Sequence, residues 1–405
     1  MKKWMSVVVF LVVFALCQCL LPYTFYALED RTLFLFTPDY FAQVFSMSWG
    51  IAHLVWSFVA QFFVIPCVGA SVVALLALLV YWVVGRLVRP LFSALAVCAT
   101  VAVLVLLPVV RQAEQWNRLE YAALHYDWDE VLRIATPGRC KDKPEMMPYA
   151  LLALGERGEL PTRMFCYPIE NAESMTLEGW RSHRAYTFQT LLYACTGCYV
   201  EAAHRNSMSG TYLCHGTSFG NLRRSVWLYE NIHAGALADK YRSILSRSLL
   251  HHNWKHAAAP VRSSKPIATE NHTDTIPAIT DQFLYNMAVL VNEGYVSRPN
   301  IDRMLCAALA QRDLSSFMKF MEGVAGRQEL ATHYQEAILV ATMLQPSLSA
   351  DKYRISASVR SAFQRFSTLM SRHQVQAAKA AFPHSFWSFY FDESNRFPST
   401  NDKRP

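Results

Sequence analysis

The feature that most constrains this chain is an apolar block, residues 62–110, that carries charge only at Arg86 and Arg89. These two arginines divide the block into segments 62–84 and 91–110, each of about 20 residues. At ~1.5 Å per residue, a helix of that length crosses a ~30 Å hydrocarbon core. The block therefore predicts two transmembrane helices joined by a short basic turn.

The chain begins with two lysines and an apolar run, a combination that is typical of a secretory signal peptide. No small-x-small cleavage site follows this run, and neither Cys17 nor Cys19 follows the small residue that a lipoprotein site needs. We therefore predict that residues 4–21, about 27 Å of helix, form a first transmembrane span that is not cleaved. A cleaved signal peptide is the alternative.

Residues 39–61 carry polar side chains at spacings of three or four, which would place them along one side of a helix. The stripe consists of Gln43, Ser46, Gly50, His53, Ser57 and Gln61. It could line a cavity or contact a polar head group, since polar side chains at membrane depth face protein or water. Alternatively, the helix is amphipathic and lies in the interface, with Trp49 and Trp56 at the head groups. We favour the interfacial helix.

The charges around these segments predict the topology. Lys2 and Lys3 precede the first span. Acidic residues follow it, in an aromatic segment interpreted as a loop: Glu29, Asp30 and Asp39. The positive-inside rule then places the amino terminus in the cytoplasm. With three crossings the two central arginines are also cytoplasmic, and four crossings would reverse them. We predict three crossings of the bacterial cytoplasmic membrane and an extracytoplasmic carboxy-terminal part.

After residue 110 charged residues are frequent, and apolar residues take helical spacing interrupted by Gly and Pro. Helix pairs are predicted with turns near Asp127, Gly197 and Gly235. Their alternation of small and large apolar residues is typical of tetratricopeptide-like repeats. The fold class is therefore all-α. The predicted domains are a transmembrane domain 1–110, a first helical-repeat bundle 111–259, a linker or long loop 260–280, a second bundle 281–391 and a polar tail 392–405.

Six motifs occur along the chain in the order LFLFTPDYF, AQFFVIPCVGA, YDWDEVL, GELPTRMF, HYQEAIL and FWSFYF. As an ordered set they resemble a family of multi-spanning bacterial membrane proteins known only as a domain of unknown function. The resemblance covers nearly the whole chain. It implies a membrane-embedded amino-terminal part and a helical-repeat carboxy-terminal part, and it implies no activity, substrate or catalytic residue. The chain departs from the family pattern at CTGCY, where a plainer helix-turn-helix sequence is expected.

The cysteine motif is the strongest candidate for a metal site. Cys195 and Cys198 form a CxxC pair, and further candidate ligands follow at His204, Cys214 and His215. A structural zinc site needs four convergent ligands, and the side chains of two adjacent residues would hardly converge on one ion. A redox pair is the second interpretation. The third, two small residues buried at a repeat turn, is the one we favour, and we predict no metal and no cofactor.

Two groups of histidines could serve chemistry. The motif HHNWKH holds His251, His252 and His256, but it lacks the glutamate of a metalloprotease, and we interpret them as surface histidines at a helix end. His333 and Glu336 share a helix face, as a base and an acid could. No nucleophile elbow or phosphate-binding glycine loop accompanies them. The sequence therefore predicts no catalytic residue.

Partners are predicted from the remaining features. The lysines and arginines after residue 110 are spread out, which argues against nucleic-acid binding. Glu336, Trp387 and Tyr390 are candidates for an interaction surface or glycan platform if exposed, although the terminal aromatic run favours core packing. We therefore expect contact with the lipid bilayer and with another envelope protein or a glycan.

The predicted function is a membrane-anchored helical-repeat interaction or scaffold protein of the bacterial cell envelope. The alternative is a membrane enzyme or transporter that acts on a lipid-linked or polar substrate. In that alternative the polar stripe of residues 39–61 and the acidic segment before it face the soluble part.

Overall fold

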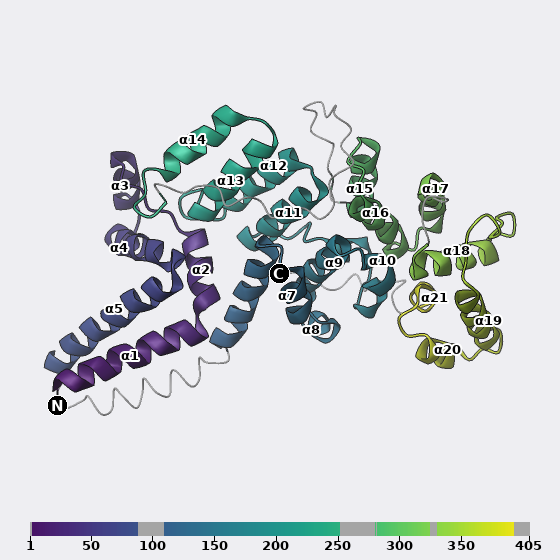
Figure 1. Ribbon diagram of the computed structural model, residues 1–405, viewed down its shortest axis with the longest axis horizontal. Coiled ribbons are helices and arrows are strands. Elements are labelled where there is room, and N and C mark those ends of the chain that lie inside the picture. Colours follow the sequence, from purple (N-terminus) through teal and green to yellow (C-terminus); the bar gives the residue numbers. More distant parts are fainter. Residues whose placement is uncertain (1, 88–108, 252–279, 281, 325–329, 393–405) are drawn as a thin grey trace. The chain divides into compact units, whose positions relative to one another are not determined.

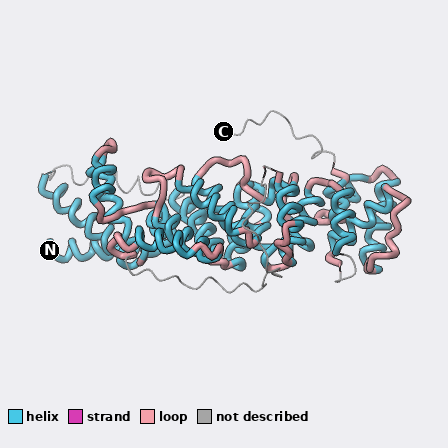
Figure 2. The backbone as a smooth tube through the Cα atoms, turned by 90° about the horizontal axis from the view of Figure 1, so that it is seen from above, coloured by secondary structure: helices cyan, strands magenta, loops and turns pink. Residues whose placement is uncertain are grey.

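The computed structural model describes residues 2–87, 109–251, 280, 282–324 and 330–392. Throughout these ranges the backbone forms helices and turns, without a β-strand (Figure 2). The predicted all-α class is therefore confirmed. Two compact units divide the chain. Unit 1 comprises Met1–Asp127, Arg181–Ala194 and Tyr199–Val261, and unit 2 comprises Trp128–Trp180, Cys195–Cys198 and Arg262–Pro405.

Unit 1 contains the amino-terminal apolar helices together with part of the predicted first bundle. In chain order its helices are α1 (Lys2–Leu20), α2 (Pro22–Arg31), α3 (Pro38–Phe45), α4 (Gly50–Ala60), the 3-10 turn η1 (Gln61–Val64), α5 (Pro66–Leu87), a helix through residues 109–124, the first part of α11 (His183–Thr196), α12 (Tyr199–Gly210), α13 (Phe219–Asn231) and α14 (Gly235–Leu245).

Helices α1 and α5 pack side by side (Figure 1). Helix α5 is long and apolar enough to cross a membrane, and α1 with α2 counts as a second span if this pair, bent by 78°, is one crossing. Pro22 begins α2, because proline lacks the N–H that a helix interior needs but is accommodated in a first turn. The predicted third span, 91–110, lies outside the described residues apart from its last two positions.

Residues 39–61 differ from the predicted single helix. They form α3 and α4, separated by a turn in which Trp49 takes a left-handed conformation with φ 64°. Gly50 permits this reversal, since a Cβ there would lie 2.3 Å from the Val44 carbonyl oxygen. At about 12 Å and about 17 Å the two helices are each too short to cross a bilayer.

The predicted acidic loop also differs, because residues 22–31 form helix α2. Only the segment that follows is extended. Its Phe36 N–H donates to the Arg247 carbonyl at 2.8 Å, and its Thr32 carbonyl accepts from the Phe219 N–H at 2.8 Å. These bonds join the segment to the start of α13 and to the turn after α14.

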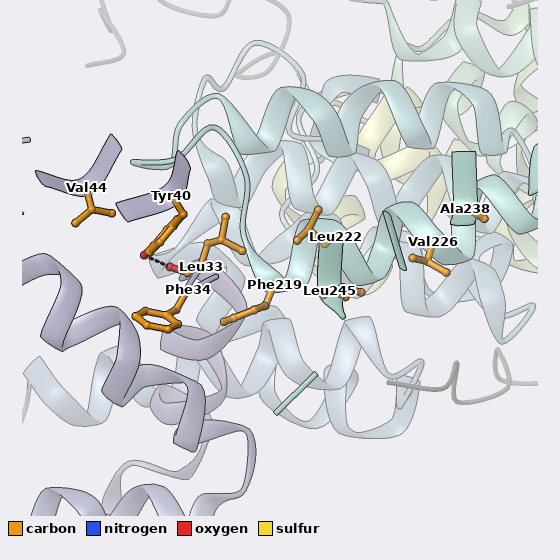
Figure 3. Packing of buried hydrophobic residues seen from close by; sticks show 9 residues of the cluster. All are labelled: Leu33, Phe34, Tyr40, Val44, Phe219, Leu222, Val226, Ala238 and Leu245. Atoms are coloured by element: carbon orange, nitrogen blue, oxygen red, sulfur yellow. Dashed lines mark hydrogen bonds between the residues drawn. The ribbon is translucent and has the colours of Figure 1, made fainter. Parts of the chain in front are cut away.

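An apolar cluster reinforces that junction (Figure 3). It buries Leu33, Phe34, Tyr40 and Val44 from the amino-terminal segment against Phe219, Leu222, Val226, Ala238 and Leu245 of α13 and α14. The Tyr40 hydroxyl donates to the Leu33 carbonyl at 2.7 Å, so its polar atom is satisfied within the cluster. The aromatic motif LFLFTPDYF is thus core-forming sequence in unit 1.

Unit 2 is a succession of short helices. They are α7 (Trp128–Ile134), α8 (Pro137–Asp142), η3 (Pro144–Met146), α9 (Met147–Glu156), α10 (Leu160–Arg163), η4 (Met164–Cys166), η5 (Ala172–Met175), α15 (Phe283–Asn292), α16 (Arg298–Ala310), α17 (Leu314–Val324), α18 (Thr332–Leu344), α19 (Ala357–Ser371), α20 (Val375–Ala381) and α21 (Phe386–Tyr390).

Several predicted turns are confirmed. The helix through residues 109–124 ends just before Asp127, and Gly197 separates α11 from α12 with φ 90°. Glycine is favoured at such a position because it has no Cβ to clash in the left-handed region. The predicted linker and polar tail lie outside the described residues, apart from positions 280 and 392.

Candidate functional site: the buried ion cluster of helix α2

The last turn of α2 carries two carboxylates into the interior of unit 1. Glu29 has no exposed surface and Asp30 is 5% exposed. Arg223 donates two hydrogen bonds to Glu29, both at 2.8 Å, and a third to Asp30 at 3.2 Å. Arg224 reaches Asp30 at 3.1 Å. Together with His251, these four residues are called the α2 ion cluster.

His251 completes the cluster from the turn after α14. It is 2% exposed, its Nε2 lies 3.0 Å from a Glu29 oxygen, and its ring packs on Phe219 with centroids 4.3 Å apart. The interpretation as a surface histidine is therefore wrong for this residue. His252 and His256 lie outside the described residues.

The charges of the cluster hold its carboxyls ionised. Burial opposes ionisation of Asp30, but the guanidinium groups of Arg224 and Arg223 outweigh it and lower the pKa to about 2. The same balance between burial and Arg223, helped by the His251 ring beside the carboxylate, leaves the pKa of Glu29 below its ordinary value. Because buried charges are tolerated only when paired, these contacts fix α2 against α13.

Gly220 explains how a carboxylate comes so close to a helix backbone. A Cβ at this position, in the first turn of α13, would lie 2.0 Å from an Asp30 oxygen. Ser218 caps the same helix end through its side chain, which accepts from the Asn221 N–H at 3.2 Å. The amino end of a helix carries a partial positive charge, so the carboxylate of Asp30 is also favoured there electrostatically.

The other end of α2 is held by a second carboxylate. Glu114, on the helix through residues 109–124, accepts from the N–H groups of Tyr23 and Thr24 at 2.7 and 2.9 Å. The Thr24 hydroxyl donates to it at 2.5 Å, and Asn117 donates to that hydroxyl at 3.0 Å. Glu114 therefore caps the start of α2 across about 90 positions of sequence. Contacts with Glu114 and within the α2 ion cluster thus fix both ends of α2.

A small cavity lined by both apolar and charged residues lies beside the cluster, between α2, the helix through residues 109–124 and α11. Its volume is about 20 Å³, and its lining includes Asp30, Glu120 and His183. Glu120 is bonded to Arg31 at 2.7 Å and to Arg184 at 2.6 Å. A space of this size has room for about one water molecule.

The predicted polar stripe is divided among three elements, α3, α4 and η1. Gln43 is exposed on α3. On α4, the His53 Nδ1 lies 3.1 Å from the Ser57 hydroxyl, and the His53 ring meets the edge of His215 with centroids 4.9 Å apart. Gln61, in η1, is fully buried and its Oε1 accepts from the Leu249 N–H at 3.3 Å. The polar side of α4 thus faces the helices and turns of unit 1.

The candidates in unit 2 are placed mainly in its interior. His333 Nδ1 lies 2.8 Å from Glu336, and the same carboxylate accepts from the Phe386 N–H at 2.7 Å, at the start of α21. Trp387 is buried, and Tyr390 is partly buried. Glu336 and Trp387 are buried, which agrees with the core packing that the sequence favoured for the terminal aromatic run over an exposed platform.

Cys195 and Cys198 are both buried as thiols. Within the ranges that the structure covers, no group of three or more His, Cys, Asp or Glu side chains is arranged to hold a metal ion. The burial of both thiols agrees with the interpretation as small residues at a turn between helices.

Comparison with known proteins identifies the family. Residues 1–115 and 96–393 match the family of unknown function DUF6057. The chain belongs to that family. This confirms the predicted resemblance to an uncharacterised family. No curated protein and no solved structure matches the chain.

From the sequence of this DUF6057 chain, Glu29 and Asp30 were interpreted only as acidic residues of a loop, and Arg223 and Arg224 were not singled out. The signal is present as two tandem pairs: Glu29–Asp30 in an aromatic segment, and Arg223–Arg224 just after a capping serine. Nothing in the sequence alone says that the pairs meet, because 194 positions separate Glu29 from Arg223. Glu114 was likewise missed, since a cap normally comes from the residue just before its helix.

Proposed function

We propose that this chain is a membrane-anchored interaction protein of the bacterial cell envelope, whose helical part binds another envelope component. The observation that carries the proposal is the outer surface of α1 and α5. Although the two helices pack together, their described residues expose thirteen large apolar side chains on the other sides. On α1 these include Val7, Leu11 and Leu16, and on α5 they include Leu75 and Leu79.

Such a surface is costly in water. Apolar area contributes about 25 cal/mol per Å² when it is removed from water, so a half-exposed leucine forgoes about 1 kcal/mol. An apolar patch this large is expected to have an apolar partner. A lipid bilayer supplies one, and at ~1.5 Å per residue the 22 residues of α5 are long enough to cross it.

The arrangement of α2 supports a holding function over a chemical one. Its two buried carboxylates are engaged by guanidinium groups, and a third carboxylate caps its start. Helix α2 thereby attaches α1 firmly to α13 and to the helix through residues 109–124. A firm attachment suits a protein that presents helical surfaces beside a membrane. The charge rule places those surfaces outside the bacterial cytoplasmic membrane.

Anchoring is tested by alkaline extraction of membranes from cells that express the full chain. We expect the chain to stay in the membrane fraction, and its release would contradict anchoring. Reporter enzymes fused after Arg111 then test the side. An active periplasmic reporter with a silent cytoplasmic one is expected, and the reverse pattern would overturn the extracytoplasmic assignment.

Interaction is tested by photo-cross-linking in intact cells. A photoreactive amino acid replaces one exposed residue at a time in unit 2, at Trp180, Tyr285 or Met343. At least one position should give a discrete adduct with an envelope protein or glycan, while the membrane-facing position Leu79 should not. If all three positions give no adduct in chains that remain membrane-bound, the interaction proposal is wrong.

A further inference from the structure

We propose that the hairpin of α3 and α4 is a second membrane contact, which lies in the head-group region of the leaflet where α1 ends and α5 begins. The inference rests on the proposed membrane anchoring and deepens it. It assigns a lipid-binding surface to residues 38–64, in addition to the helices that would cross the bilayer.

One side of the hairpin is apolar and exposed. Trp49, at the turn between the helices, is 86% exposed, and Ile51 is 71% exposed. The remaining large apolar residues of this surface are Phe45, Val55, Trp56 and Phe58. From Tyr40 to Gly85 the sequence contains no Asp, Glu, Lys or Arg. Asp39, exposed in the first turn of α3, is the only Asp, Glu, Lys or Arg between residues 38 and 64, so the rest of the hairpin offers a partner apolar and aromatic contacts.

The opposite side of the hairpin is fixed to unit 1. Tyr40 and Val44 of α3 are buried in the cluster with α13 and α14. Gln61 accepts a hydrogen bond from the turn after α14, and His53 packs on His215. Because these inward contacts hold one side, the hairpin cannot rotate to bury its apolar side within the same unit. That side needs an external partner.

Continuity along the chain identifies lipid as this partner. Only η1 and Ile65 separate α4 from α5, whose own exposed side is apolar along its length. The two hairpin helices are too short to cross, whereas tryptophan and phenylalanine are favoured at the interface between head groups and acyl chains. A docked protein or a second copy would have to bind a surface that continues directly into the proposed spanning helix.

The test is photo-cross-linking of the full chain in membranes that contain radiolabelled phospholipid. The photoreactive amino acid is placed at Trp49 or, independently, at Ile51. Leu79 of α5 serves as the position for anchoring. Tyr40, an aromatic residue on the inner side of the same hairpin, is the matched control. We expect lipid adducts at Trp49, Ile51 and Leu79, and at least tenfold less lipid label at Tyr40.

The outcomes separate the hairpin from the anchor. Lipid adducts at Leu79 without adducts at Trp49 and Ile51 would overturn the interfacial hairpin and leave anchoring intact. Protein adducts at Trp49 and Ile51 in place of lipid would overturn it in favour of a docked partner or a second copy. If Leu79 also takes no lipid label, membrane anchoring itself is wrong, and the hairpin proposal is wrong with it.

Discussion

Asp30 in unit 1 and Asp302 in unit 2 are almost equally buried, with 5% and 1% of their surfaces exposed. Their pKa values are shifted in opposite directions. Two guanidinium groups that are themselves largely buried outweigh the burial of Asp30 and bring its pKa down to about 2. Burial dominates at Asp302, whose bonds to the Tyr334 hydroxyl and to the exposed Arg298 do not compensate, and its pKa is raised.

The difference shows what each carboxylate does. Asp302 bonds to Arg298 within its own helix and to a neighbouring helix of the same unit, so it adjusts local packing. Asp30, with Glu29, bonds to residues more than 190 positions away and holds α2 against α13. A buried ion cluster that costs desolvation is favourable only when every charge is paired. The α2 ion cluster therefore acts as a lock between two distant segments.

The largest expected effect comes from removing one partner of the lock. Arg223→Ala leaves the buried Glu29 without its main partner and removes one of the two guanidinium groups bonded to Asp30, and we expect it to lower the free energy of unfolding by about 3–5 kcal/mol. Arg242→Ala, which removes a half-exposed arginine paired with Glu230, should cost less than about 1 kcal/mol. Denaturant unfolding of the full chain in detergent micelles measures both. Equal losses would mean that the cluster is no stronger than a surface ion pair.

Gly220 tests the lock by steric means. Gly220→Ala places a Cβ on the Asp30 carboxylate, and overpacking of this kind should cost about 1–3 kcal/mol. Gly235→Ala is the matched control, because it also changes a glycine in the first turn of a helix but has nothing within 4 Å. The control should be neutral or stabilising by up to about 1 kcal/mol. A neutral Gly220→Ala would show that the carboxylate does not lie against α13.

The two aspartates should respond to pH with opposite signs. The pKa of Asp30 is lowered from 3.8 to about 2, so its contribution to stability is complete above pH 3.8 and is lost as the pH falls toward 2. The loss in free energy of unfolding that Asp30→Asn causes, relative to the parent chain, should therefore grow by about 2 kcal/mol as the pH rises through this window.

Asp302→Asn provides the contrast. Because the pKa of Asp302 is raised, its contribution to stability is present below pH 3.8 and is lost as the pH rises through the folded-state pKa. The variant should therefore gain stability relative to the parent chain as the pH rises. Unfolding of the parent chain and both variants from about pH 2 to about pH 6 measures the two slopes. Slopes of the same sign would contradict the comparison.

The smallest expected effect is at the start of α2. Glu114→Gln keeps the shape of the cap but removes its charge, and it should cost about 1 kcal/mol. Asp239→Asn, at an exposed carboxylate of α14, should cost less than about 0.5 kcal/mol. Thermal unfolding of the full chain distinguishes them. If the two variants are equally stable, Glu114 does not hold the helix.

Local sequence patterns predicted much of the fold. Gly197 and the turn before Asp127 were identified because glycine and polar turn residues set the backbone conformation locally. The break between α3 and α4 was missed, since the stripe from Gln43 to Gln61 keeps helical spacing across it. Gly50 permits the close approach to Val44 at this break, and periodicity does not encode that contact.

The candidate site depended on contacts that the sequence does not disclose. Two adjacent acids in an aromatic segment are typical of an exposed loop, and only the distant arginines make their burial favourable. His251 was assigned to the surface for the same reason, because its partner Glu29 lies over 200 positions earlier in the sequence. Terminal aromatics such as Trp387, which is buried, were predictable as core residues, because large aromatic side chains contribute mainly through the area that they bury and need no specific distant partner.

The most direct test of the lock is a double-mutant cycle between Glu29 and Arg223 in the full chain. Glu29→Ala, Arg223→Ala and the double variant are compared with the parent chain by denaturant unfolding in micelles. Close buried charge pairs have coupling energies of about 1.5–7 kcal/mol, and we predict at least about 2 kcal/mol here. A coupling energy within about 0.5 kcal/mol of zero would contradict the account, because the two residues would then act independently.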